Sequence, residues 1–246
     1  MNNLLEVCAG SLNSALAAQK GGAQRIELCT NLSEGGTTPS AGVIRQAVRL
    51  MNIPVFVLIR PRSGDFLYSD IEFEAMKEDI VFCKEHRAKG VLFGILEKNG
   101  DVDVERCVEL VNIARPMQVT FHRAFDMVRF PFKALEEIIG MGFDRILTSG
   151  QANSVIEGAS LIADLVYRAE NRIVIMPGGG ITENNAAALI KMTGTREVHA
   201  SLRSPILSQM RYKENKVSMG NQEQREYEWL ETDVERVRAV CVSFKS

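Results

Sequence analysis

Residues 4–8 read Leu-Leu-Glu-Val-Cys, and residues 25–29 read Arg-Ile-Glu-Leu-Cys. In each short stretch the apolar side chains alternate with Glu and Cys, which is the period of a β-strand. The segment between them, residues 12–21, carries apolar residues at the spacing of an amphipathic helix. A strand, a helix and a second strand in this order predict a βαβ unit with two parallel strands.

The strand–helix unit repeats along the chain, and Ser69 with Glu72 marks one helix start as a capping box. Eight such pairs in 246 residues average about 31 residues each, the repeat of a (β/α)8 TIM barrel, an α/β fold. Strands are expected at residues 4–8, 25–29, 54–60, 90–95, 117–122, 144–149, 172–176 and 196–201. Helices are expected at residues 12–21, 40–51, 71–86, 104–114, 132–140, 154–168, 183–192 and 222–242.

A doubly wound open sheet uses the same alternation and is the competing fold. The first strand–helix junction, Cys-Ala-Gly-Ser at residues 8–11, lacks the Gly-x-Gly-x-x-Gly pattern of a dinucleotide-binding sheet, so the barrel is preferred. No linker rich in Pro, Gly or Ser divides the chain. We therefore expect one TIM-barrel domain over residues 1–246, with an irregular connection at residues 202–222.

The composition is that of an ordinary globular protein, with 46% hydrophobic and 24% charged residues. A net charge of −2 gives no electrostatic footprint for nucleic acid. No apolar run approaches the roughly 18 residues of a membrane span, and the N-terminus does not resemble a signal peptide. The five cysteines lack any Cys-x-x-Cys spacing, which indicates reduced thiols in the cytoplasm.

Alternation along the strands also predicts which side chains point into the barrel. Apolar residues that face the helices leave thiols and polar groups pointing inward near the ends of the strands, where TIM-barrel active sites lie. The alternative is a neutralised polar core. The inward residues at these strand ends are Glu6, Cys8, Glu27, Cys29, Arg60, His122, His199 and Ser201.

Acid–base chemistry is one hypothesis for this cluster, with Glu6, Glu27 and His122 transferring protons. Arg60 and Arg62 would hold an anionic ligand. Because isolated buried charges are costly, Glu6 and Glu27 are expected to pair with Arg60 or with a protonated imidazole. No inward lysine ends a strand, which disfavours a Schiff-base aldolase.

A glycine run, Gly178-Gly179-Gly180, follows the seventh strand. Its backbone N–H groups could approach a phosphate, because TIM barrels often bind phosphate with the loops after strands seven and eight. Ser201, which ends the eighth strand, would join this anion site. A tight turn between strand and helix explains the glycines equally well.

A soft-metal site is the hypothesis for Cys8 and Cys29. Two inward thiols on neighbouring strands, about 4.8 Å apart, could bind linear Cu(I), with His199 or a Met as an optional third ligand. The alternative is that both cysteines pack as small hydrophobic residues, and the sequence alone favours this alternative.

The chain resembles the CutC family of TIM barrels, named for copper homeostasis. The resemblance runs over nearly the whole chain, although Thr37 and the Arg-Ala-Lys at residues 87–89 depart from the family pattern. The motifs that carry it are Glu-Val-Cys at 6–8, Arg-Ile-Glu-Leu-Cys at 25–29, Glu-Gly-Gly-Thr-Thr-Pro-Ser at 34–40, Ile-Arg-Pro-Arg at 59–62, Val-Leu-Phe-Gly at 91–94, Thr-Phe-His-Arg-Ala-Phe-Asp at 120–126, Ile-Leu-Thr-Ser-Gly at 146–150, Pro-Gly-Gly-Gly-Ile at 177–181 and Glu-Val-His-Ala-Ser at 197–201.

The resemblance implies a cytoplasmic protein, commonly a homodimer, that handles copper and binds Cu(I) through thiols, a role that would fall on Cys8 and Cys29. The residues themselves also suggest an enzyme acting on a small anionic or phosphorylated metabolite, because the cluster holds more groups than a thiol pair requires. A barrel retained for protein interaction is a third possibility.

Overall fold

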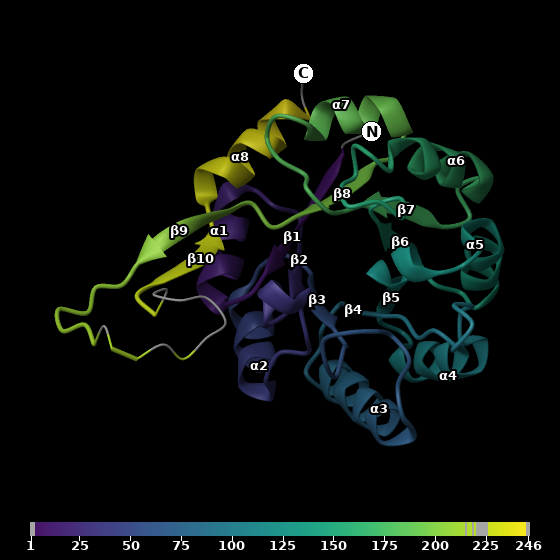
Figure 1. Cartoon of the computed structure of the whole chain (residues 1–246), viewed down its shortest axis with the longest axis horizontal. Coiled ribbons are helices and arrows are strands. Elements are labelled where there is room, and N and C mark those ends of the chain that lie inside the picture. The colour runs from purple at the N-terminus through teal and green to yellow at the C-terminus, as the bar shows by residue number, and fades with distance from the viewer. Residues whose placement is uncertain (1–2, 215, 218, 220–225, 245–246) are drawn as a thin grey trace.

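Eight parallel strands form a barrel with helices around it (Figure 1), as the sequence predicts. The computed structural model describes residues 3–214, 216–217, 219 and 226–244. The strands run in the order β7-β6-β5-β4-β3-β2-β1-β8, and an isolated parallel bridge between Gly178 and His199 joins the two ends of this sheet. The strands are β1 Leu4–Ala9, β2 Arg25–Leu28, β3 Val55–Leu58, β4 Gly90–Phe93, β5 Gln118–Phe121, β6 Arg145–Thr148, β7 Val174–Pro177 and β8 Glu197–Ala200.

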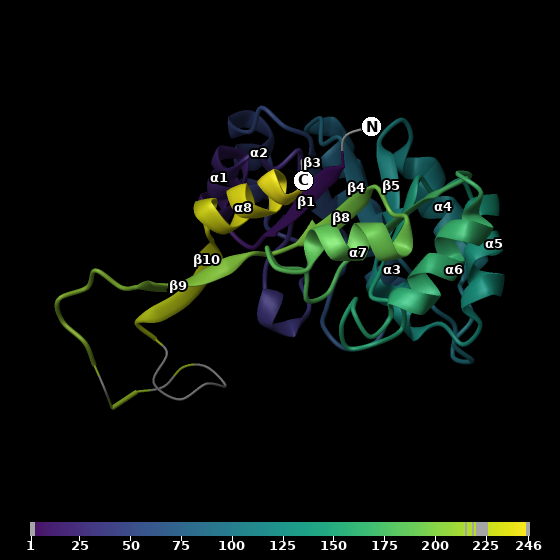
Figure 2. The same cartoon turned by 90° about the horizontal axis from the view of Figure 1, so that it is seen from above.

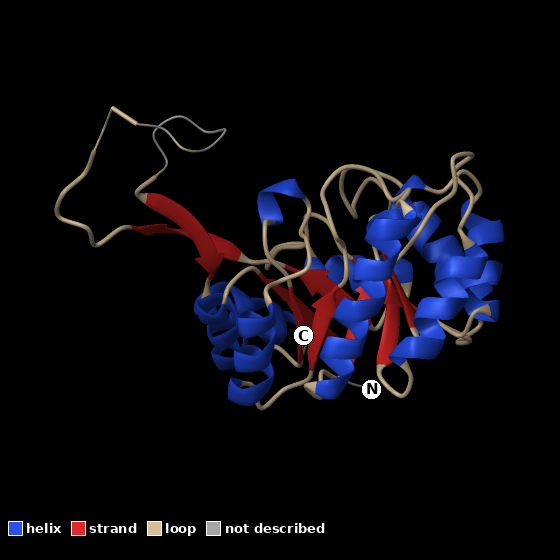
Figure 3. Ribbon diagram, turned by 90° about the horizontal axis from the view of Figure 1, so that it is seen from below, coloured by secondary structure: helices blue, strands red, loops and turns tan. Residues whose placement is uncertain are grey.

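Helices cover the outside of the strands (Figure 3). The capping box is present at the start of α3, where the Ser69 hydroxyl accepts from the backbone N–H of Glu72 and the Glu72 carboxylate accepts from that of Ser69. The helices are α1 Leu12–Gly21, α2 Ala41–Leu50, α3 Asp70–Glu85, α4 Val104–Ala114, α5 Pro131–Gly140, α6 Ala159–Ala169, α7 Ala186–Thr193 and α8 Val234–Ser243, with short 3₁₀ turns at Leu32–Glu34 and Arg123–Met127.

Two apolar clusters fill the molecule. The larger lies between strands and helices and contains the alternate residues Leu5, Val7, Ile26 and Leu28. The smaller lies inside the barrel, and its members come from β1, β3, β4, β6 and β7 and from the residue directly after β2. This division follows the predicted alternation. The inner cluster consists of Cys8, Cys29, Phe56, Leu58, Leu92, Leu147 and Met176.

The expected helix at residues 222–242 is wrong in its first part. Residues Glu228–Thr232 form β10, which pairs antiparallel with β9, Arg203–Leu207. Residues 222–225 of the expected helix lie outside the described residues. The Asp233 carboxylate accepts from the backbone N–H groups of Glu235 and Arg236, so α8 begins only after it.

The β9–β10 hairpin projects from the barrel beside α1 and α8 (Figure 2). The connection expected to be irregular from residue 202 therefore begins with a strand, and its partner lies about 25 residues later in the chain. Pairing across that distance leaves no local signal that tells β10 from the start of a helix. Among the described residues, no helix combines the length and apolarity needed to cross a membrane.

Candidate functional site

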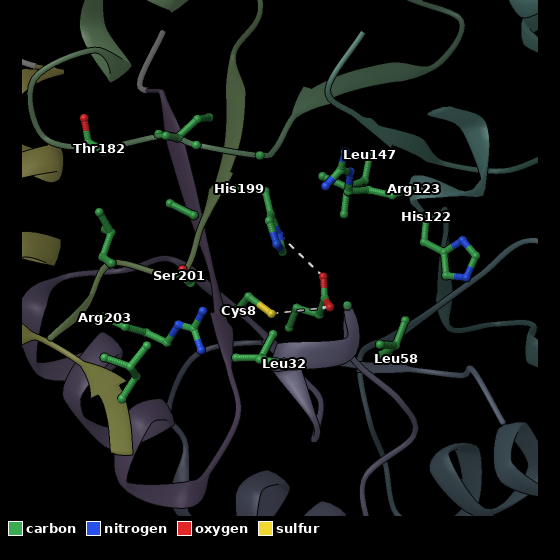
Figure 4. Close-up of a pocket in the computed structure, with 18 of the residues that line it drawn as sticks. Cys8, Leu32, Leu58, His122, Arg123, Leu147, Thr182, His199, Ser201 and Arg203 are labelled. Carbon is green, nitrogen blue, oxygen red and sulfur yellow. Dashed lines mark hydrogen bonds and ion pairs between the residues drawn. The ribbon is translucent and has the colours of Figure 1, made fainter. Parts of the chain in front are cut away.

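A cavity of about 450 Å³ lies at the carboxyl ends of the barrel strands (Figure 4). Cys8 of β1, Glu27 of β2 and His199 of β8 line it, together with the loops that follow β3, β5, β7 and β8. The register of the sheet explains why these three side chains meet, because Cys8 is opposite Glu27 and Glu6 is opposite His199. The strand ends thus assemble the group that alternation predicted.

The thiol, carboxylate and imidazole lie within reach of one another. The Cys8 Sγ is 3.6 Å from Glu27 Oε1, and His199 Nδ1 is 3.5 Å from Glu27 Oε2. One ligand atom from each of the three residues lies within 4.8 Å of the other two, so they could hold a metal ion. Cys29 Sγ, which is fully buried, lies 3.3 Å from Cys8 Sγ and adds a second thiol beside this group.

Glu6 lies fully buried beneath this cluster. Burial alone would raise the pKa of its carboxyl, but Arg25 and His199 outweigh burial and lower that pKa to about 2. The contacts are short, with Arg25 Nε 2.5 Å from one carboxylate oxygen and His199 Nδ1 2.8 Å from the other. Glu6 is therefore a fixed negative charge that orients His199, and it has no proton to exchange near neutral pH.

The pKa values of the other three titratable groups, Glu27, His199 and Cys8, are raised. Burial raises the pKa of Glu27 despite the neighbouring His199. Burial opposes protonation of His199, yet Glu27, Cys8 and Glu6 together raise the pKa of its imidazole well above its usual value. The hydrogen bond with Cys29 and then burial raise the pKa of the Cys8 thiol well above its usual range. At neutral pH the cluster therefore contains a protonated imidazole at His199 and a protonated thiol at Cys8.

His122 directly follows β5 and lines the same cavity, but its imidazole is neutral. Burial, with a further contribution from Arg60, lowers its pKa to about 3. Its Nδ1 accepts from the backbone N–H of Ala124 at 3.2 Å, which puts the remaining proton on Nε2. The predicted acid–base role of His122 is therefore reduced to that of a neutral hydrogen-bond donor.

The two arginines predicted to bind an anion are used elsewhere. Arg60 lines the cavity, but its Nη atoms donate to the backbone carbonyls of Glu34, Gly36 and Gly64. Of the two partners expected for Glu6 and Glu27, the protonated imidazole of His199 is confirmed and Arg60 is not, and Arg25 also pairs with Glu6. Arg62 pairs with Asp65 on the loop before α3 and with Glu72 in the first turn of α3, and it does not line the cavity.

The residues of the loop after β7 have two roles: one closes the barrel, and the others line the cavity. Gly178 belongs to the closing bridge with β8, and a Cβ there would lie 2.5 Å from a methyl carbon of Leu147. Gly179, Gly180 and Ser201 do line the cavity. Gly179, Gly180 and Ser201 could therefore contribute to the predicted anion site. Gly178 could not, because its N–H donates to the Thr148 carbonyl.

Known proteins resemble this chain over most of its length. The sequence pattern of the CutC family matches residues 3–204. The copper homeostasis protein cutC homolog of Homo sapiens is 50% identical over 238 residues, covering 96% of this chain and 87% of the relative. The chain belongs to the CutC family. A family protein CutC from Chromobacterium violaceum is also 50% identical, over 98% of this chain and 97% of the relative.

Solved structures agree with the CutC assignment. A CutC structure from Streptococcus agalactiae has a TM-score of 0.77 and 38% identity, covering 81% of this chain and 98% of that one. Phosphoribosylanthranilate isomerase from Thermotoga maritima has a TM-score of 0.59 and covers 100% of both chains, but its 13% identity supports the shared fold alone.

The sequence of this CutC chain did not identify three arginines that lie in or near the site. Arg25 shares the alternation of Glu27 and points inward, so the same rule could have found it. Arg123 and Arg203 follow strands β5 and β8 and line the cavity. No periodicity applies to the first residues of a loop, and only the folded backbone shows where they point.

Proposed function

We propose that this CutC-family protein acts in copper homeostasis by binding Cu(I) as cargo, in the cytoplasm, through Cys8 and Cys29. The observation that carries the proposal is the 3.3 Å separation of the two buried sulfur atoms. Thiolates are the soft ligands that Cu(I) prefers. The copper homeostasis name of the human relative supports the same function.

The donor set fits Cu(I) with a small adjustment. Two metal–sulfur bonds of about 2.3 Å in line would place the sulfur atoms about 4.6 Å apart, so the thiols would have to separate on binding. His199 is the proposed third ligand, since it could share a metal ion with Cys8. Both thiols must lose their protons, so we expect copper affinity to rise with pH and binding to release protons.

The test is a titration of the reduced protein with Cu(I) under anaerobic conditions against a competing chelator. The Cys8→Ser/Cys29→Ser variant should lose tight one-to-one binding. Cys241→Ser, a partly buried cysteine of α8 outside the cavity, is the matched control and should bind as the wild type does. Retention of affinity by the double variant would rule out the thiol pair as the copper site.

A second candidate function is an enzyme that acts on a small anionic metabolite by acid–base chemistry. The observation that favours it is the cavity volume of about 450 Å³, which suits a small molecule and far exceeds the needs of one ion. The pKa values of Glu27 and His199 are both raised, so Glu27 could accept a proton and His199 could donate one. Glu6 would orient the imidazole.

The enzyme proposal predicts a phosphorylated metabolite that raises the melting temperature of the wild-type protein. Glu27→Gln should bind that compound but lose at least about a hundredfold in kcat. Cys8→Ser/Cys29→Ser should keep most of the activity. Full activity in the Glu27→Gln variant would show that Glu27 is not the base.

The family resemblance also leads us to propose a homodimer. Light scattering of the purified chain would measure its mass in solution. A mass of one chain at micromolar concentration would contradict this proposal.

A further inference from the structure

Arg123 is held in one position at the edge of the cavity. Its Nε donates to Asp126 Oδ2 at 2.7 Å, and its Nη2 donates to Ser149 Oγ at 2.8 Å. Asp126 is itself fixed, because it accepts from the Thr148 hydroxyl at 2.5 Å and from the backbone N–H of Ser149 at 2.9 Å. Within the described chain, no acceptor meets Nη1 of Arg123. A guanidinium fixed in this way is ready to bind an anion.

The glycine loop after β7 packs against this guanidinium. A Cβ at Gly179 would lie 3.2 Å from Cβ of Ser149 and 3.6 Å from Nη1 of Arg123. Gly179 and Gly180 have φ angles of 120° and 82°, which side chains of other residues rarely allow. Glycine therefore permits both the backbone turn and the close approach to Arg123.

Two backbone N–H groups of this loop are available to a ligand. The Gly179 carbonyl accepts from the N–H of Val155, and the Gly180 carbonyl accepts from Nδ2 of Asn185, both at 2.9 Å. In a trans peptide the next N–H points opposite to the carbonyl, so the N–H groups of Gly180 and Ile181 point away from these partners. Neither N–H has an acceptor among the described residues, and both residues line the cavity.

The charge of the cavity wall favours an anion. Glu27 is the carboxylate among the lining residues, and four guanidinium groups line the same cavity. Two of these have carboxylate partners, Asp126 and Glu183, and the other two have none in the described part of the chain. Figure 4 shows two of the four, with Cys8 and His199 between them. The four arginines are Arg60, Arg123, Arg203 and Arg236.

We infer that Arg123 and the backbone N–H groups of Gly180 and Ile181 bind the phosphate group of a small phosphate monoester. Fixed N–H donors beside a guanidinium form a typical site for a tetrahedral oxyanion. The cavity extends from this loop to Glu27 and His199, so the rest of the ligand would reach the titratable cluster. The inference deepens the enzyme proposal and rests on it, and Asp126 and Ser149 are its positioning residues.

The test is calorimetric titration of the full chain with inorganic phosphate and with glycerol 3-phosphate, at constant ionic strength. Arg123→Gln removes the charge and should weaken binding of both probes at least about tenfold. Arg172→Gln is the matched control, because Arg172 is similarly exposed and pairs with Glu136 outside the cavity. Both variants should give the wild-type circular dichroism spectrum.

Four outcomes decide the inference. Loss of binding in Arg123→Gln with retention in Arg172→Gln supports it. Equal binding by wild type and Arg123→Gln, no binding by the wild type, or equal loss in both variants overturns it. Failure of the enzyme proposal can be distinguished from failure of the phosphate site. If phosphate binding depends on Arg123 but no phosphate monoester is converted, the anion site stands without the catalytic function.

Discussion

His122 shows how burial changes the chemistry of a single residue. A strand-end histidine beside other polar groups suggests acid–base catalysis, yet burial and Arg60 lower the pKa of this imidazole to about 3. His199 lies in the same cavity, and carboxylates beside it raise its pKa. Sequence alternation predicted that both rings point inward. It could not predict their opposite charge states, because these depend on which side chains of other strands contact each ring.

The lowered pKa of His122 predicts that acid destabilises the protein. The unfolded imidazole binds a proton below about pH 6.5, whereas the folded one does so only near pH 3. Stability is therefore lost as the pH falls below 6.5, by about 2–3 kcal/mol at pH 4.5 from this residue. Urea unfolding followed by circular dichroism at pH 6.5 and at pH 4.5 measures the loss of stability. His122→Gln should lose less stability over this interval, and an identical loss would contradict the assigned charge state.

At the scale of the element, the eight short strands were predictable because each carries its own apolar run and its own turn. The register explains one glycine that begins a strand. Gly90 of β4 is opposite Phe56 of β3, and a Cβ at Gly90 would lie 2.6 Å from the Phe56 ring. The aromatic ring thus occupies the space that a side chain on β4 would take inside the barrel.

Gly90→Ala is expected to destabilise the protein by about 1–3 kcal/mol, because the Phe56 ring has to move within a packed core. The control is Gly140→Ala at the end of α5, where a Cβ meets nothing within 4 Å. That variant should gain up to about 1 kcal/mol, since alanine favours the helix. Urea unfolding midpoints compare the two, and equal midpoints would contradict the packing argument.

At the scale of the whole molecule, buried charges join strands that lie far apart in the sequence. Arg25 of β2 contacts Glu6 of β1 and Glu197 of β8, and Arg145 of β6 also contacts Glu197. These residues sit on the inner face near the amino ends of the strands, opposite the cavity end. The alternation in the sequence predicts which side chains point into the barrel, but it does not show which charged groups contact one another across it.

Arg25→Met should destabilise the fold by about 3–5 kcal/mol, because it leaves the fully buried Glu6 carboxylate without its closest partner. Thermal unfolding followed by circular dichroism measures this effect. Arg172→Met breaks an exposed pair with Glu136 and should leave the unfolding midpoint almost unchanged. Similar midpoints for the two variants would show that the buried contact does not stabilise the barrel.

The projecting β9–β10 hairpin carries the residue that determines the intrinsic tryptophan fluorescence of this protein. Trp229 of β10 is the single tryptophan of the chain, and its side chain is 46% exposed, away from both apolar clusters. Intrinsic tryptophan emission therefore reports on the hairpin, whereas the barrel contributes none. Emission should be red-shifted already in the native state, and an emission transition at lower urea than the loss of helical ellipticity would mean that the hairpin detaches while the barrel stays folded.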